Sequence, residues 1–316
     1  MLDALLRNEV DVSFSCKTGV CQTCLMRATS GVVSEEAQVG LKDTLVAQNY
    51  FLACSCKPVQ DLVISLPDAA DIFAPAKISH KKLLADDVLQ LNLDPSIAMY
   101  YHAGQFINLR RSDGLARSYS IASLPQVDKD IELHIKRMKN GEMSNWLFDQ
   151  AKVGDHLDMQ GPIGNCFYLP GKKERNLLLI GTGTGLAPLI GIVRDALFHG
   201  HEGEIHLYHG CRRQEGFYKH DAICLLESEH SNFQYHPCNS QAELEFEFKN
   251  NHKILTGRAN ELALKRHKQL SGWVIYLCGV PEMVNKTKKQ AYLAGVALED
   301  IYADPFELTE LREKPR

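Results

Sequence analysis

The sequence lacks the features that would place it in a membrane, a secretory pathway or a nucleic-acid complex. Its 316 residues contain no run of eighteen apolar residues, so we expect no membrane span. The N-terminal stretch carries acidic residues within its apolar run and has no small-residue cleavage site, so it does not predict a secretory signal. With 35 basic and 39 acidic residues the net charge is −4, which provides no electrostatic footprint for nucleic acid. We therefore expect a cytoplasmic globular protein.

The ten cysteines are the most informative residues present. In a protein that is not exported they predict metal ligands or buried thiols rather than disulfides. Cys16, Cys21 and Cys24 form the pattern C-x4-C-x2-C, and Cys54 follows at a distance. This is the plant-type spacing for a 2Fe–2S cluster, in which one tight loop supplies three thiolates and a separate segment supplies the fourth. Gly19 would let the loop backbone approach the cluster closely.

Two other interpretations compete at these cysteines. A four-cysteine zinc site usually shows paired C-x2-C elements, which the first half of this pattern does not match. Free cysteines also pack as small hydrophobic residues, but three within nine residues on a glycine-containing loop fit that role poorly. Cys56 is the alternative to Cys54 as the fourth ligand.

Residues 1–67 resemble plant-type ferredoxin domains, which have a β-grasp fold. Because F-L-A-C resembles the segment around the fourth ligand of such domains, the resemblance implies that Cys54 completes the ligand set and that Cys56 is a packed thiol. Such domains open with a β-hairpin, whereas here the stretch L-D-A-L-L-R-N that normally follows the hairpin comes first. We expect either that the start of the reading frame was assigned too late or that the domain folds incompletely.

The rest of the chain divides into two parts that differ in the pattern of their apolar residues. Residues 68–76 are small and interrupted by proline, which predicts a linker. Residues 77–172 contain short alternating apolar runs between turns, typical of an antiparallel barrel or sandwich; these runs lie at 88–93, 105–109, 117–123 and 130–138. Residues 173–316 contain continuous apolar strands that alternate with helical stretches, which predicts a parallel α/β sheet; the strands lie at 177–180, 204–210 and 272–279.

Two segments of the predicted barrel suit a dinucleotide. In R-S-Y-S, Arg117 and Tyr119 share one face of an extended strand, where a cation and a flat ring can lie along a ligand while Ser120 donates from its hydroxyl. The sequence from Gly141 to Ser144 begins a predicted helix, whose N-terminal N–H groups suit a pyrophosphate. A turn at 161–164 follows.

The predicted α/β part has a phosphate cradle. The strand at 177–180 runs into G-T-G-T-G and a helix opening, a combination suited to a dinucleotide, although the pattern is not G-x-G-x-x-G. A second strand ends in Cys278-Gly279-Val280-Pro281. Plain strand–helix connections and a buried strand cysteine are the alternatives.

Together and in this order, these motifs resemble the ferredoxin–NADP reductase superfamily. The resemblance implies that Arg117 pairs with the pyrophosphate of FAD, that Tyr119 lies against the flavin and that Ser120 is near its reactive nitrogen. The helix-opening residues that would close over the pyrophosphate are Gly141, Met143 and Ser144. FAD is implied because the branch with its ferredoxin domain first typically uses it.

For the nicotinamide side, the resemblance to the family pattern G-T-G-x-G-x-A-P implies a nucleotide site. The cradle residues would be Gly181, Thr182, Gly183, Thr184 and Gly185. In the matching C-G-x-P segment, Cys278 would lie beside the nicotinamide, with Gly279 and Pro281 next to it. Phe306 and Asp304 fall where relatives place a residue against the flavin, and the resemblance implies Ser120, Cys278 and Phe306 as the catalytic residues. Arg212 and Arg213 leave the choice between NADH and NADPH open.

The three predicted domains together predict an electron-transfer chain. A nicotinamide gives two electrons together and a plant-type cluster takes one at a time, so a flavin is needed between them. The order of domains resembles the reductase components of bacterial oxygenases and the reductases that serve deoxysugar dehydrases. It implies transfer from NADH or NADPH through FAD and a 2Fe–2S cluster to a terminal oxygenase or another one-electron protein acceptor. The alternatives are a stand-alone flavin reductase or diaphorase with a non-functional ferredoxin segment, and a zinc-binding interaction protein.

Overall fold

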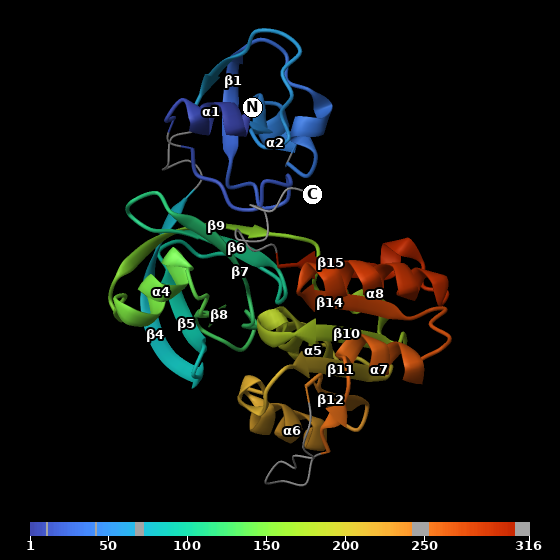
Figure 1. Ribbon diagram of the computed structural model, residues 1–316. Helices are drawn as coiled ribbons and strands as arrows, with labels where there is room; N and C mark the ends of the chain where they lie inside the picture. The colour runs from blue at the N-terminus through green and yellow to red at the C-terminus, as the bar shows by residue number, and fades with distance from the viewer. Residues whose placement is uncertain (11, 42, 67–72, 242–252, 307–316) are drawn as a thin grey trace.

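The computed structural model describes residues 1–10, 12–41, 43–66, 73–241 and 253–306, and these form three regions, each built on its own sheet (Figure 1). The N-terminal region lies at the top of the view, an antiparallel barrel lies below it, and a parallel α/β region lies beside the barrel. The antiparallel and parallel sheets predicted from the sequence are therefore confirmed. No helix in the described part of the chain is both long and apolar enough to cross a membrane.

The N-terminal region is a small sheet in the order β2-β1-β3, with antiparallel pairing throughout. Its elements are α1 (Leu2–Arg7), β1 (Leu25–Ser30), α2 (Asp43–Val46), β2 (Tyr50–Leu52) and β3 (Val63–Ser65). Met26, Phe51 and Leu52 are almost completely buried in its core. The first turn of α1 is fixed by the backbone N–H of Leu2, which donates to the Ala53 oxygen at 3.0 Å. The cysteine loop lies at the end of this region that faces the barrel.

The middle region is a six-stranded antiparallel sheet in the order β7-β6-β9-β4-β5-β8. Its strands are β4 (Ala74–Ala85), β5 (Val88–Pro95), β6 (Phe106–Arg110), β7 (Ala116–Ser120), β8 (Ile131–Lys136) and β9 (His156–Ile163). A bridge between Ile121 and Leu133 joins the two edges, so the sheet closes into a barrel. Helix α4 (Glu142–Asp149) buries Met143 and Leu147 in the barrel core.

The predicted linker and the barrel overlap in the structure. Strand β4 begins at Ala74, so the last residues of the predicted linker 68–76 belong to a strand, paired with β9 from Ala74 onward. The alternation of small and apolar residues there was too short to indicate a strand by itself. Residues 68–72 of the predicted linker, and residue 67 before it, lie outside the described residues.

The C-terminal region is a six-stranded sheet in the order β13-β12-β11-β10-β14-β15, with parallel pairing between all neighbours. Its strands are β10 (Leu177–Thr182), β11 (Ile205–Cys211), β12 (Phe233–Asn239), β13 (Leu255–Thr256), β14 (Val274–Gly279) and β15 (Ile301–Pro305). Its helices are α5 (Leu186–Phe198), α6 (His220–Glu229), α7 (Ala259–Arg266) and α8 (Pro281–Leu293). Helices α5 and α6 pack on one face, and α7 and α8 pack on the other.

The strand order of this sheet determines where a ligand can bind. The chain moves outward from β10 through β11 to β12, and it later returns to the other side of β10 as β14 and β15. The order therefore reverses between β10 and β14, and such switch points leave a crevice beyond the carboxyl ends of the strands. The G-T-G-T-G turn and the C-G-V-P segment both lie at that edge.

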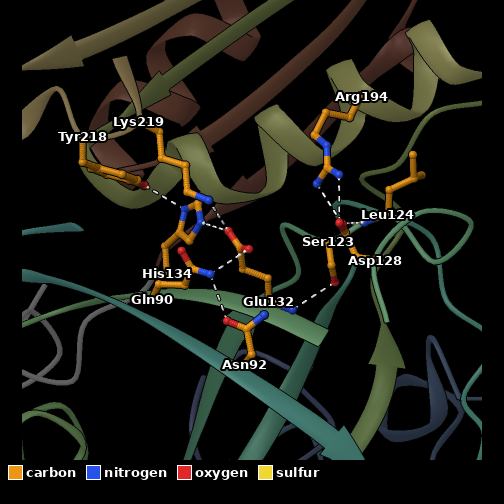
Figure 2. Close-up of polar contacts among 10 residues, drawn as sticks. All are labelled: Gln90, Asn92, Ser123, Leu124, Asp128, Glu132, His134, Arg194, Tyr218 and Lys219. Carbon is orange, nitrogen blue, oxygen red and sulfur yellow. Dashed lines mark hydrogen bonds and ion pairs between the residues drawn. The ribbon is translucent and has the colours of Figure 1, made fainter. Parts of the chain in front are cut away.

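Polar contacts join the barrel to the α/β region (Figure 2). The carboxylate of Glu132, on β8, accepts from Lys219 Nζ at 2.6 Å and lies 2.7 Å from His134 Nε2. His134 Nδ1 lies 3.2 Å from the Tyr218 hydroxyl. Burial opposes ionisation of Glu132, but the contacts with His134 and Lys219 prevail and lower its pKa to about 2.

A second ion pair lies beside the first in the same interface. Both guanidinium nitrogens of Arg194, on α5, donate to the carboxylate of Asp128 at 2.7 and 2.9 Å. The same carboxylate accepts the Leu124 N–H, so it also fixes the loop that leaves the barrel. These two partly buried ion pairs thus fix the position of the barrel relative to the α/β region.

The depressed pKa of Glu132 predicts a specific pH dependence of stability. Because the folded-state pKa is about 2 and the ordinary value is 4.5, its contribution is fully present above pH 4.5 and is lost as pH falls toward 2. Glu132→Gln should lower the free energy of unfolding by about 1–3 kcal/mol at pH 7, and the gap to wild type should narrow below pH 4.5. Urea unfolding of both proteins at pH 7 and pH 4 measures this.

The matched control is Asp87→Asn, which removes the exposed ion pair with Lys136 at the edge of the same barrel. Exposed pairs contribute about 0–1 kcal/mol, so this variant should unfold close to wild type at both pH values. An equal loss in the two variants, or a gap for Glu132→Gln that does not change with pH, would contradict the prediction.

Candidate functional site

The structure brings four cysteines of the N-terminal region together as two pairs. Cys16 is hydrogen-bonded to Cys21, and Cys24 is hydrogen-bonded to Cys54. The two pairs also interact, since the charge of Cys16 acts to raise the pKa of Cys54 and the charge of Cys21 acts to raise the pKa of Cys24. The structure thus brings together the four residues that the sequence predicts as ligands, including the distant Cys54.

Hydrogen bonding within each pair lowers the pKa of one thiol and raises that of the other. The contact with Cys21 lowers the pKa of Cys16 to about 4, and the contact with Cys24 lowers the pKa of Cys54 to about 6. The pKa values of Cys21 and Cys24 are raised, because each donates to its partner and is buried. Each pair therefore holds one thiolate readily, and the thiolate is the form that binds metal.

Backbone groups of the loop already point at the sulfur atoms. The N–H groups of Thr18 and Cys21 donate to Cys16 Sγ at 3.4 and 3.2 Å, and the Cys16 N–H donates to Cys21 Sγ at 3.2 Å. The Thr23 hydroxyl donates to Cys21 Sγ at 3.1 Å. Such donors stabilise negative charge on sulfur and set the potential of an iron–sulfur cluster.

The conformation of the loop explains the need for glycine and distinguishes Cys54 from Cys56. Gly19 has φ of +82°, and a Cβ atom there would lie 2.6 Å from Ser55 Oγ, next to Cys54. Cys56 is instead buried in the core of the N-terminal region, where burial raises its pKa. No group of three or more His, Cys, Asp or Glu residues within the described ranges could hold a single metal ion. Thiols arranged as two pairs fit a cluster of two irons better than one tetrahedral zinc ion.

The predicted flavin strand is β7, between the cysteine loop and the α/β region. Its pairing with β6 puts Tyr119 opposite Ile107 and Ser120 opposite Phe106. Arg117 is partly exposed, and its Nη1 donates only to the neighbouring Ala116 oxygen among the contacts described, at 2.7 Å. A guanidinium with most of its donors free suits a phosphate ligand.

The predicted pyrophosphate turn is present at the start of α4, with one change in how its residues contribute. A Cβ at Gly141 would lie 2.5 Å from Ser144 Oγ, so this position requires glycine. The Ser144 hydroxyl donates to the Gly141 oxygen and accepts the Met138 N–H, so it is engaged in shaping the turn. The Met143 side chain is 1% exposed in the barrel core. Because the Ser144 and Met143 side chains are engaged within the protein, the groups of this turn that suit an anion are the backbone N–H groups at the start of α4.

The G-T-G-T-G turn is packed so closely that two of its glycines have no room for a side chain. A Cβ at Gly181 would lie 2.7 Å from Leu189 Cδ1, and one at Gly185 would lie 2.3 Å from the Cys278 oxygen. Gly183 has φ of +55° and open space around it. Helix α5 begins directly after the turn at Leu186, so the predicted cradle has the strand–turn–helix geometry that binds a nucleotide phosphate.

The C-G-V-P segment lies beside this turn. Cys278 is opposite Gly181 in the pairing of β10 and β14 and is completely buried. Gly279 has φ of +124°, and a Cβ there would lie 2.4 Å from Thr182 Oγ1, whose oxygen also accepts the Val280 N–H at 3.2 Å. Pro281 is the first residue of α8, where its missing N–H costs nothing. Thr184 belongs to the same turn and is partly exposed.

The C-terminal strand β15 connects the barrel to the nucleotide crevice. Asp304 is opposite Cys278 in the sheet, and its Oδ2 accepts the Ser120 hydroxyl at 3.1 Å. The Phe306 N–H donates to the Gly279 oxygen at 2.7 Å. Burial raises the pKa of Asp304 to about 6, although the hydrogen bond from Ser120 opposes this. The three residues predicted to be catalytic, Ser120, Cys278 and Phe306, are thus gathered at one point.

Some residues of this crevice were not predicted from the sequence. His209 is completely buried beneath the glycine turn, with Nε2 3.0 Å from the Gly183 oxygen, and burial lowers its pKa to about 4, so its ring is neutral. Cys166 Sγ lies 3.8 Å from Cys278 Sγ. A histidine within a run of apolar strand residues was the only sequence signal for His209. Arg212 and Arg213, predicted to meet the nucleotide, are exposed just after β11.

Family models match the three regions separately. The models match a 2Fe-2S iron-sulfur cluster binding domain over residues 1–59, an oxidoreductase FAD-binding domain over 75–168 and an oxidoreductase NAD-binding domain over 179–289. The first match contains all four paired cysteines, the second contains R-S-Y-S, and the third contains the glycine turn and Cys278. The site geometry and the family models therefore agree on FAD, NAD(P)H and a 2Fe–2S cluster as cofactors.

Known proteins resemble the chain over nearly its whole length. It is 31% identical over 312 residues to the ferredoxin–NAD(P)+ reductase component of the naphthalene 1,2-dioxygenase system of Pseudomonas putida, covering 97% of this chain and 93% of that protein. It is 32% identical to the reductase subunit of an aromatic O-demethylase of Amycolatopsis, with the same coverage. The crystal structure of the Amycolatopsis cytochrome P450 reductase GcoB superposes with a TM-score of 0.72 at 29% identity, covering 96% of this chain and 93% of that one.

The packing at Gly185 predicts a selective loss of nucleotide binding. In Gly185→Ala the new methyl group would meet the Cys278 oxygen at 2.3 Å, and overpacking of this kind costs about 1–3 kcal/mol. We expect the Kd for NAD(P)H to rise by about 10-fold or more, with flavin content retained, measured by equilibrium titration. The control is Gly171→Ala, where nothing lies within 4 Å of the added Cβ. Equal affinity in the two variants would contradict the prediction.

The relatives named above are a reductase component and a reductase subunit. A loop of paired thiols, a barrel whose flavin strand carries a guanidinium with most of its donors unengaged among the contacts described, and a nucleotide crevice at a switch point all lie in one chain. Each of them matches its own family model in the same order along the sequence. The chain is therefore an NAD(P)H-dependent oxidoreductase that belongs to the family of ferredoxin–NAD(P)+ reductases with an N-terminal 2Fe–2S domain.

Proposed function

We propose that the protein passes electrons from NAD(P)H to a terminal oxygenase, as the reductase component of a system that hydroxylates or demethylates an organic substrate. The relatives named above serve a naphthalene 1,2-dioxygenase and an aromatic O-demethylase. Bound FAD supplies the change from paired to single electrons, and the 2Fe–2S cluster supplies the single-electron exit. The roles divide among residues 1–67 for the cluster, 77–172 for FAD and 173–316 for the nicotinamide, with 68–76 between the first two.

One observation carries this proposal. The cysteine loop packs directly on the flavin barrel, where Cys16 and Cys21 contact Phe106 of β6. Strand β6 pairs with β7, and β7 carries Arg117, Tyr119 and Ser120. The cluster loop thus packs on the strand next to the flavin strand, and it also reaches β7 itself, because the Ser118 hydroxyl donates to Ser15 Oγ at 3.5 Å. This proximity supports direct electron transfer. A ferredoxin segment without a function would have no need of this close contact.

In the proposed mechanism the residues of the chain bind and orient. The N–H groups of the Gly181–Gly185 turn and the N-terminus of α5 hold the nucleotide phosphates, while Arg117 and the N–H groups at the start of α4 hold the FAD pyrophosphate. Cys278, buried and protonated because burial raises its pKa, positions the nicotinamide without acting as a nucleophile. Phe306, directly after β15, is held beside the C-G-V-P segment by its N–H, which donates to the Gly279 oxygen.

The Ser120–Asp304 pair holds a proton where the barrel and the α/β sheet meet. The Ser120 hydroxyl donates to Asp304 Oδ2 at 3.1 Å. With a pKa of about 6, the Asp304 carboxyl exchanges its proton near neutral pH. Four thiolates, from Cys16, Cys21, Cys24 and Cys54, would hold the two irons two by two.

The proposal predicts that loss of one cluster ligand separates two activities. Cys21→Ser should abolish reduction of a one-electron protein acceptor such as cytochrome c, because its electrons leave through the cluster. Ferricyanide reduction by NAD(P)H, which needs only the flavin, should remain within about 2-fold of wild type, since the flavin side is unchanged. Both rates are measured on the same preparation, together with its iron, sulfide and flavin content.

Two results would contradict this function. Equal loss of both activities in Cys21→Ser would show that the thiols do not form the exit path. An anaerobic titration of the wild-type protein with NADH or NADPH provides the second test, because both the flavin absorbance and a low-temperature EPR signal of the reduced cluster should change. Bleaching of the flavin with no cluster signal would favour a stand-alone flavin reductase.

A further inference from the structure

The two faces of strand β6 have different partners. Ile107 and Leu109 point into the barrel core and are completely buried there. Phe106 and Asn108 point outward, since side chains alternate along a strand, yet they are only 6% and 0% exposed. The cysteine loop covers this outer face, so β6 lies between the barrel core and the loop (Figure 1).

The amide of Asn108 is paired on both sides. Its Nδ2 donates to the backbone oxygen of Cys21 at 2.6 Å and to Gln160 Oε1 at 2.8 Å. Its Oδ1 accepts the Ser118 hydroxyl at 2.7 Å. Gln160 on β9 and Ser118 on β7 are its direct neighbours across the sheet. The amide is therefore held rigidly by three adjacent strands of the barrel and directs one N–H at the cysteine loop.

The backbone oxygen that Asn108 holds belongs to a predicted cluster ligand. The next residue, Gln22, has φ of +57°, a conformation in which few residues other than glycine persist without support. The N–H of Cys21 donates to Cys16 Sγ at 3.2 Å. The peptide groups on both sides of the Cys21 Cα atom are thus fixed, one by the sulfur of the first thiol pair and one by the barrel.

We propose that Asn108 is a positioning residue for electron transfer, which acts through Cys21 to hold the cluster loop at a fixed separation from the flavin strand β7. This inference rests on the proposed function. The rate of electron transfer falls steeply with the separation of two centres. A loop released from Asn108 should therefore slow the exit of electrons and leave the nicotinamide and flavin side unchanged.

The test uses two variants of the complete holoprotein. Asn108→Leu has the same branched shape but no donor, and Asn108→Ser keeps a polar group that is too short to reach the Cys21 oxygen. In both, the ratio of cytochrome c reduction to ferricyanide reduction should fall by about 10-fold or more, since small misplacements of reacting groups can cost about 100-fold. Rates are normalised to the iron and flavin content of each preparation.

The matched control is Ser13→Ala, which removes a different hydrogen bond between the same two regions. The Ser13 hydroxyl donates to the Gly114 oxygen at 3.3 Å, away from the cysteine peptides. This variant should keep the wild-type ratio within about 2-fold. If every contact between the regions contributed equally, Ser13→Ala and the Asn108 variants would lower the ratio alike, and that result would overturn the specific role of Asn108.

A second measurement does not depend on activity. Hydrogen–deuterium exchange of peptides that cover residues 16–24 should be faster in both Asn108 variants and unchanged in Ser13→Ala, because an opened loop loses the protection of its backbone groups. Unchanged exchange together with an unchanged ratio in the Asn108 variants would overturn the inference. A wild-type protein without iron and sulfide would instead overturn the proposed function, so the two failures are distinguishable.

Discussion

The arrangement of the protein depends on the contact between the cysteine loop and the outer face of β6. Three regions with separate cores meet there and at the crevice edge, and electrons can pass only if those regions do not move apart. At β6 the contact combines apolar packing of Phe106 against Cys16 and Cys21 with the buried amide of Asn108. The apolar part excludes water, which strengthens the hydrogen bonds inside. The amide then selects one orientation of the loop, which packing alone would not do.

The second interface, between the barrel and the α/β region, uses charge instead. Glu132 with Lys219 and Asp128 with Arg194 form short ion pairs at the foot of the barrel. In the same interface, the Ser120 hydroxyl of the barrel donates to Asp304 on β15. The two regions are thus joined by these partly buried ion pairs and by this hydrogen bond. Charged groups that are withdrawn from water penalise wrong arrangements strongly, which suits an interface that must keep one geometry.

The sequence predicts those features of the fold and of the site that depend on a few consecutive residues. The thiol spacing, the R-S-Y-S strand and the glycine turn each lie within a few consecutive residues, and the structure places them as expected. Residues whose importance arises from tertiary pairing gave no such signal. Asn108 is one polar residue in an ordinary strand pattern, and Glu132 is one acid among many. Met143 is a different case. Its place in a predicted binding turn was evident from the sequence, but the burial of its side chain depends on how α4 packs against the barrel.

The alternation along β6 has a consequence for how such a chain can diversify. Its inward residues belong to the barrel, and its outward residues belong to the neighbouring module. Substitutions at Phe106 and Asn108 can therefore remodel the attachment of one module without disturbing the fold of the other. A single inserted or deleted residue would exchange the two sets and damage both. Evolution can thus retune the coupling of these units by point changes, whereas the length of this short strand must be preserved.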